Sequence, residues 1–218
     1  MDQVIRSIIT GNTEKYQKLS DILKYLFVDI AGISQNKYYI LGSYAIRQYR
    51  TINDLDINLD DQEFLKLENL TKKGFGHIEF YNAQIRWFYD LTQQYNELTH
   101  SNENDFSIEA FQKRPFDGFP DQRFSLGYLT ENNGLSKDDN GHQFFNLLTL
   151  LEWKKTMNRP KDKPDIELIN ELLTTKKMSG GHYQHSHNCH QKLKNGQYCK
   201  NMTKNAHYCW KHNKNNAQ

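Results

Sequence analysis

Hydrophobic residues recur every three or four positions between residues 13 and 30, which predicts one buried face of an amphipathic helix. A short apolar run at 37–41 then stops at Gly42, as expected for a buried strand that enters a tight turn. From Asp54 to Asp60, acidic or amide side chains alternate with Leu and Ile, the period-two pattern of a strand with one polar face. Asp54 and Asp56 are therefore expected to project from the same face of that strand.

The rest of the chain predicts further helices and strands. Helices are expected over 44–49, 62–70 and about 165–173, two strands within 77–91 joined near Asn82, and another strand over 106–111. Residues 115–140 hold three Gly and two Pro, which predicts a long irregular connection with one short strand at 124–129. From Gly141, an apolar stripe predicts a helix that ends before Pro160; its members are Phe144, Phe145, Leu147, Leu148, Leu151 and Met157. The predicted fold class is α/β (α+β), with a small mixed sheet flanked by helices.

Composition favours a globular chain with one principal domain. A length of 218 residues is enough for a real core, and 25 Phe and Tyr side chains compensate for a hydrophobic content of only 37%. No apolar run approaches the roughly 20 residues needed to span a bilayer, and the first residues lack the hydrophobic region of a signal peptide. We therefore expect a cytoplasmic protein with no membrane partner.

Charge divides the chain near its C-terminal end. After Ser179 there are six Lys and no Asp or Glu, so the first 178 residues carry a formal charge of about −4. Gly180 and Gly181 give this boundary the composition of a flexible linker. We predict three segments, namely a main domain over 1–178, a linker over 179–187 and a small module over 188–218.

The most specific chemical signal joins a glycine turn to a pair of carboxylates. Gly42 and Ser43 follow the first predicted strand, and Asp54 and Asp56 lie on the next. A divalent cation that bridges nucleotide phosphates needs hard oxygen ligands a few ångströms apart, which an Asp-x-Asp strand supplies. The glycine lets backbone N–H groups approach a phosphate closely, the Ser43 hydroxyl adds a donor, and the following helix would present its positive N-terminus.

The segment YYILGSYAIRQYRTINDLDINLD resembles the signature of the polymerase-β-like nucleotidyltransferase superfamily, in particular its minimal members in abortive-infection systems. Ten residues separate Ser43 from Asp54, as that signature requires, and Arg50 resembles the basic residue that precedes the acidic pair. The resemblance implies transfer of a nucleoside monophosphate from a nucleoside triphosphate to a hydroxyl acceptor, with release of pyrophosphate. It also implies Mg²⁺ or Mn²⁺ held by Asp54 and Asp56.

Such enzymes use a third carboxylate on a later strand, and several residues are candidates. Glu109 in FSIEAF is preferred, because it alternates with apolar neighbours as Asp54 and Asp56 do. Glu79 and Asp90 are the alternatives.

A second segment, LLEWKKTMNRPKDKPDIELI, resembles the region near the C-terminal end of many minimal transferases. The resemblance implies that Lys155 or Lys161 binds the triphosphate, and that Asp162 and Asp165 brace or cap the adjoining helix. Ordinary solvated charges at a helix end are the alternative for both lysines.

The basic tail contains all three cysteines and six of the nine histidines. Cys189, Cys199, Cys209 and His212 form a Cys-x9-Cys-x9-Cys-x2-His pattern, a complete tetrahedral shell for Zn²⁺. So short a segment cannot bury a sufficient core, so the metal would supply the folding free energy. The segment resembles small Cys-Cys-Cys-His modules of large DNA viruses and some cellular proteins. Its lysines and aromatic residues suit nucleic-acid contact, and a protein-docking or stabilising module is an equal alternative.

Two functions follow from these observations. The first is a metal-dependent nucleotidyltransferase whose acceptor is a protein, an RNA or a small molecule, with the basic tail favouring RNA. The second is a catalytically inactive nucleotide- or nucleic-acid-binding adaptor that acts through its zinc module, because a fold does not fix an activity.

Overall fold

A computed structural model describes residues 2–81, 84–112 and 122–178 of the chain. Its contacts divide the chain into two units, Met1–Ile169 and Asn170–Gln218. Every strand of the described residues and the candidate site lie in the first unit, and residues 170–178 of the second continue a helix. The predictions for the linker and for the zinc ligands Cys189, Cys199, Cys209 and His212 lie outside the described residues.

The first unit contains a seven-stranded mixed sheet with the order β3-β4-β5-β2-β1-β7-β6. Its strands are β1 (Tyr38–Ile40), β2 (Asp54–Leu59), β3 (His77–Tyr81), β4 (Gln84–Asp90), β5 (Ser107–Gln112), β6 (Leu135–Lys137) and β7 (Gln143–Phe145). The pairs β2–β5 and β1–β7 are parallel, and the other neighbours are antiparallel. The predicted mixed α/β class is thereby confirmed.

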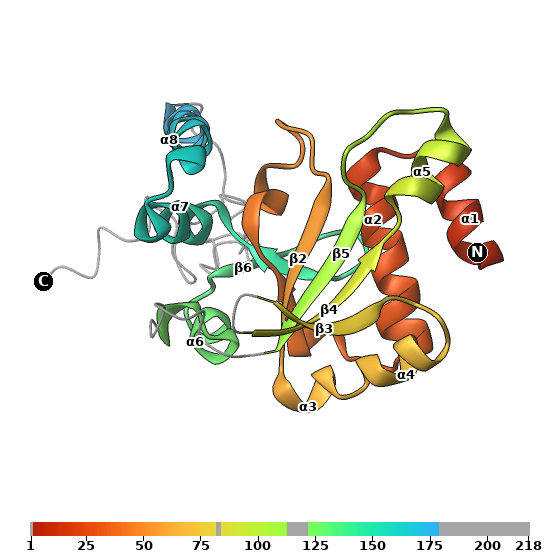
Figure 1. Cartoon of the computed structure of the whole chain (residues 1–218). Coiled ribbons are helices and arrows are strands. Elements are labelled where there is room, and N and C mark those ends of the chain that lie inside the picture. The colour runs from red at the N-terminus through yellow and green to blue at the C-terminus, as the bar shows by residue number, and fades with distance from the viewer. Residues whose placement is uncertain (1, 82–83, 113–121, 179–218) are drawn as a thin grey trace, which may run out of the picture. The chain divides into compact units, whose positions relative to one another are not determined.

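Helices surround this sheet (Figure 1). The α-helices are α1 (Gln3–Thr10), α2 (Lys15–Leu23), α3 (Asp61–Phe64), α4 (Leu67–Lys72), α5 (Thr92–Thr99), α6 (Leu126–Glu131), α7 (Leu147–Met157) and α8 (Lys163–Met178). A π-helix, η1 (Lys24–Ile30), continues α2, and the 3-10 helices are η2 (Gln35–Lys37), η3 (Gly42–Ile46), η4 (Gln122–Phe124) and η5 (Pro160–Asp162). None of the described helices is long and apolar enough to cross a membrane.

One face of the sheet packs against the hydrophobic core, and the opposite face carries the candidate site. Leu55, Ile57, Ile108 and Trp87 are fully buried against the apolar faces of α1, α2 and η1. Because side chains alternate along a strand, Asp54, Asp56 and Glu109 project from the other face. Because the alternating apolar residues of β2 and β5 are buried on one face, the acidic residues between them must point to the other face.

Several elements agree with the sequence and others differ from it. The helix from residue 13, the strands at 38–40, 54–59 and 107–112, and the two strands within 77–91 are confirmed. The strand predicted at 124–129 is wrong: η4 and α6 occupy this region, because the Ser125 hydroxyl accepts from the Tyr128 N–H and caps α6. The helix predicted from 62 to 70 is instead two short helices, α3 and α4.

The helix predicted from Gly141 begins only at Leu147. Asn146 caps it by accepting from the Thr149 N–H, and the preceding residues form β7, in which Phe144 pairs with Ile40 of β1. Phe144 and Phe145 therefore belong to the sheet and not to the predicted helical stripe.

Candidate active site

The turn after β1 brings its backbone against the acidic strand. The Leu41 N–H donates to the Asp56 carbonyl at 2.7 Å, and Gly42 then adopts a φ of +67° that favours glycine. A Cβ at Gly42 would lie 3.7 Å from Asp56 Oδ2, so the bare α-carbon faces that carboxylate. The predicted helix at 44–49 is only the five-residue 3-10 helix η3, too short for the helix-dipole contribution expected from the sequence.

Asp54 and Asp56 lie on one face of β2, and Glu109 pairs in register with Asp56 on the parallel strand β5. Asp54 is exposed and Asp56 is partly buried. Among the described residues neither aspartate forms an ion pair, although the surrounding protein removes part of the hydration of both carboxylates, that of the exposed Asp54 included, and so makes their negative charge costly.

The pKa values of Asp54 and Asp56 reflect the cost of holding two negative charges close together. Burial, followed by repulsion from Asp54 and Glu109, raises the pKa of Asp56 to about 7. Burial and the negative charge of Asp105 also raise the pKa of Asp54. The positive charge of Lys161 opposes both shifts but does not cancel them. A bound cation would remove the repulsion and restore both carboxylates to their ionised form.

Glu109, the preferred third carboxylate, is engaged by Arg86. Arg86 Nη1 donates to Glu109 Oε2 at 2.6 Å, while its Nε donates to Glu79 Oε1 at 2.6 Å. Both alternative carboxylates are engaged too, because Asp90 accepts from the Thr92 N–H at the start of α5. Across the described ranges, no three His, Cys, Asp or Glu side chains are grouped closely enough to hold a metal ion.

Arg50 and Ser43 are tied to α8. Arg50 Nη1 donates to Asp165 Oδ2 at 2.7 Å, and the Ser43 hydroxyl donates to the same oxygen at 3.1 Å. The Ser43 proton that sequence reasoning assigned to phosphate is thus directed to Asp165. The Arg50 side chain nevertheless remains 45% exposed.

A buried ionic network holds Asp165, the residue that binds Arg50 and Ser43. Lys154 Nζ lies 2.9 Å from Asp162 Oδ1 and 2.7 Å from Asp165 Oδ2, and all three residues are at most 4% exposed. Burial raises the pKa of Asp162 and Asp165, but hydrogen bonds from Arg159 and Lys154 to the first, and from Lys154 and Arg50 to the second, outweigh it and lower both. The expectation that these aspartates brace the adjoining helix agrees with the contacts.

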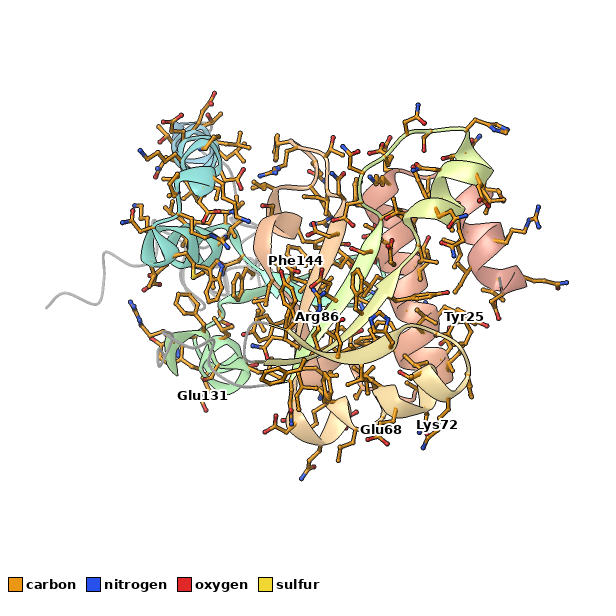
Figure 2. All side chains as sticks on the ribbon, viewed as in Figure 1. Tyr25, Glu68, Lys72, Arg86, Glu131 and Phe144 are labelled. Carbon is orange, nitrogen blue, oxygen red and sulfur yellow. The ribbon has the colours of Figure 1, made fainter. Side chains whose placement is uncertain are left out.

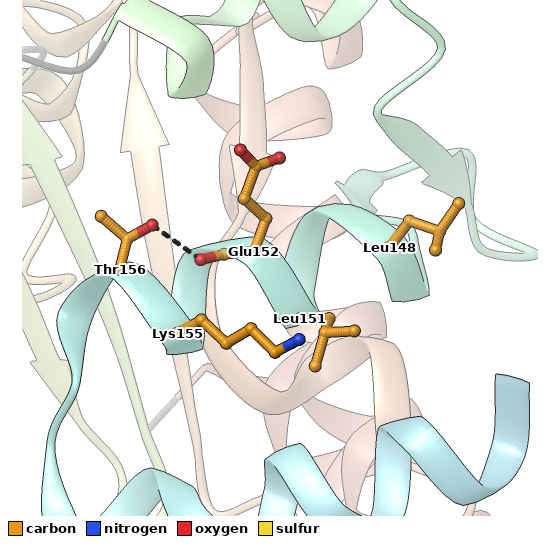
Figure 3. A pocket seen from close by; sticks show the side chains of 5 residues that line it. All are labelled: Leu148, Leu151, Glu152, Lys155 and Thr156. Carbon is orange, nitrogen blue, oxygen red and sulfur yellow. Dashed lines mark hydrogen bonds between the residues drawn. The ribbon is translucent and has the colours of Figure 1, made fainter.

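The two candidate lysines differ in position. The charge of Lys161 reaches Asp54 and Asp56, since it lowers the pKa of both. Lys155 instead lines a shallow pocket on α7 with Leu148 and Glu152, where its side chain extends along the helix (Figure 3). Lys161 is therefore the lysine that the structure brings toward the carboxylates.

Three cations of the site region were missed by sequence reasoning. They are Arg86, the buried Lys154, and Lys15, which donates to Asn53 Oδ1 at 2.9 Å and to the Asp105 carbonyl at 3.0 Å. Lys15 thereby joins the segments that lead into β2 and β5. A signal existed for Lys154, because it lies four residues after Leu150 and one after Trp153 on the buried side of α7.

Comparison with protein-family models, with curated proteins and with solved structures returned no match for this chain. The fold and site define a mixed α/β protein in which the Asp56 carboxylate faces a glycine turn and Asp54 lies on the same face of the same strand.

Proposed function

We propose that the chain is a metal-dependent nucleotidyltransferase with a polymerase-β-like catalytic domain. The observation that carries the proposal is the contact between the Gly42 turn and Asp56 on β2, with Asp54 on the same face. Neither carboxylate forms an ion pair among the described residues, and desolvation raises the pKa of each despite the positive charge of Lys161.

The residues present fit a divalent cation. Asp54 and Asp56 would hold Mg²⁺ or Mn²⁺ through their oxygens, the ligands that both ions prefer. The missing Cβ at Gly42 leaves space beside Asp56 Oδ2 for a phosphate oxygen. When bound, the cation would neutralise charge that develops at the α-phosphate.

The chain's own residues then orient the reactants. Backbone N–H groups of the 42–43 turn bind the phosphates, and Arg50 and Lys161 supply positive charge nearby. The acceptor hydroxyl oxygen forms a bond to the α-phosphorus while the bond to the pyrophosphate oxygen breaks. The hydroxyl proton passes to a carboxylate of the site, and pyrophosphate leaves.

The acceptor is proposed to be an RNA or protein hydroxyl, with the basic tail as the element that binds it. Cys189, Cys199, Cys209 and His212 would hold one Zn²⁺ there. Elemental analysis of the full chain should find about one zinc per chain, and a content far below that would refute the ligand set.

Labelled-nucleotide transfer tests the activity. The full chain is incubated with each α-³²P nucleoside triphosphate, Mg²⁺ or Mn²⁺, and either RNA or a protein extract. Wild type should label an acceptor, and the double variant Asp54→Asn with Asp56→Asn should not. A matched double variant at the exposed residues Asp29 and Asp139 should label as wild type does.

Equal labelling by wild type and by the Asp54/Asp56 variant would refute the proposal. No labelling by either protein, together with nucleotide or RNA binding by both, would favour the inactive adaptor.

A further inference from the structure

Arg86 is bonded to Glu109, the residue that the sequence favours as a third metal ligand. On β4 it bridges two carboxylates, with 2.6 Å from Nη1 to Glu109 Oε2 and 2.6 Å from Nε to Glu79 Oε1. Its side chain is only 12% exposed and that of Glu109 is 18% exposed, so the charge-assisted bond to Glu109 is largely shielded from water, whereas Glu79 is 35% exposed. Figure 2 labels Arg86 within the sheet.

Two aromatic rings hold the guanidinium in place. Its carbon lies 3.8 Å from the ring centroid of Tyr81 and 4.6 Å from that of Phe88. A planar guanidinium that stacks on rings while donating to carboxylates has little rotational freedom. Release of Glu109 would therefore break an ion pair with a guanidinium that Tyr81, Phe88 and Glu79 also hold in place.

This contact divides the carboxylates into two groups. Glu109 is the register partner of Asp56, the place where a third ligand would approach from β5. Glu109 is ion-paired with Arg86, which also pairs with Glu79, whereas Asp54 and Asp56 have no ion pair within the described part of the chain. Two aspartates carry the charge that one divalent cation balances.

We propose that Arg86 restricts the site to a single divalent cation, bound by Asp54 and Asp56, and that Glu109 positions Arg86 and is not a metal ligand. The inference rests on the proposed function and deepens it, because it replaces the three-carboxylate set expected from the sequence with a two-carboxylate set and an arginine-held neighbour.

Titration of Mn²⁺ against the zinc-saturated full chain, followed by the electron paramagnetic resonance of free Mn²⁺, tests the ligand set. Wild type should bind one equivalent, and Asp56→Asn should bind at least about tenfold more weakly because a charged ligand is lost. Glu109→Gln, whose amide oxygen still accepts from Arg86, should keep one equivalent and an affinity within about twofold. Glu79→Gln is the matched control and should behave as wild type does.

Arg86→Gln provides the complementary measurement. It frees Glu109 and should add a second Mn²⁺ equivalent or tighten binding by about tenfold. A stoichiometry and affinity unchanged from wild type in a folded Arg86→Gln protein would overturn the inference, as would a loss of about tenfold or more in folded Glu109→Gln. Either result leaves the proposed function standing, whereas absence of Mn²⁺ binding by wild type would overturn both. If Arg86→Gln does not fold, the Glu109→Gln titration alone decides.

Discussion

Replacement of Asp56 by Asn should stabilise the cation-free protein at neutral and alkaline pH. Asn has the shape of a protonated Asp and keeps its polar atoms, but it carries no charge into a partly buried position beside Asp54 and Glu109. Residues that bind a ligand often make the ligand-free protein less stable than it would be without their charges.

The pKa of Asp56 sets the magnitude and the pH window. It rises from 3.8 to about 7, and at about 1.4 kcal/mol per pKa unit this gives an upper bound of about 4 kcal/mol. Contact of the side chain with solvent reduces the effect, so we expect about 1–3 kcal/mol at pH 8.

The sign follows from which state releases its proton first. Below about pH 4 the carboxyl group is protonated in both states and adds no cost. As pH rises toward 7, the unfolded chain ionises while the folded chain retains its proton. Wild type therefore loses stability relative to Asp56→Asn across this window, and the full difference remains above it.

Urea unfolding in the presence of a chelator that leaves Zn²⁺ saturated measures this difference at pH 4, 6 and 8. Asp139→Asn, at an exposed position, is the matched control and should show no such trend. Equal stability of wild type and Asp56→Asn at pH 8, or a less stable variant there, would refute the electrostatic reasoning.

Three further changes test other parts of the structure. Lys154→Met should lower the free energy of unfolding by about 3 kcal/mol, because Asp162 and Asp165 lose a buried cation; chemical denaturation showing a loss below about 1 kcal/mol would contradict the network. Gly42→Ala should cost about 1–2 kcal/mol from its φ of +67° alone, since the Cβ has room, and an unchanged melting temperature would contradict the turn geometry. Burial lowers the pKa of His142, so its contribution to stability should fall between pH 7 and 5, and the destabilisation caused by His142→Gln should shrink over the same range; a destabilisation that grows instead would contradict it.

Strong alternation was enough to predict the central strands and the shared face of Asp54 and Asp56. In β2 every second residue is apolar and buried, and in β5 the alternate residues Ile108 and Ala110 are buried, so the sequence period and the packing agree. The α/β class and the neighbourhood of the Gly42 turn could be predicted on that basis.

The C-terminal part of the first unit was less predictable because its apolar residues do not mark one face. Leu148, which belonged to the predicted helical stripe, is 56% exposed, while Lys154 is buried. Ion pairs with Asp162 and Asp165, eight and eleven residues further on, decide which side of α7 faces inward. Hydrophobic periodicity does not detect such ion pairs. The start of α7 is set separately, by the cap at Asn146.

The third carboxylate could not be decided from sequence for a similar reason. Glu109 has the expected strand position, but its partner Arg86 lies 23 residues away on β4 and meets it only through sheet pairing. The contact depends on a register that the local pattern does not contain.

A crystal structure of the full chain soaked with Mn²⁺ and a non-hydrolysable nucleoside triphosphate tests the central claim most directly. We expect an anomalous Mn²⁺ peak about 2.0–2.5 Å from oxygens of both Asp54 and Asp56, with triphosphate oxygens against the 42–43 turn. Nucleotide bound at another surface, or Mn²⁺ absent from these two aspartates in crystals that contain the nucleotide, would contradict the account.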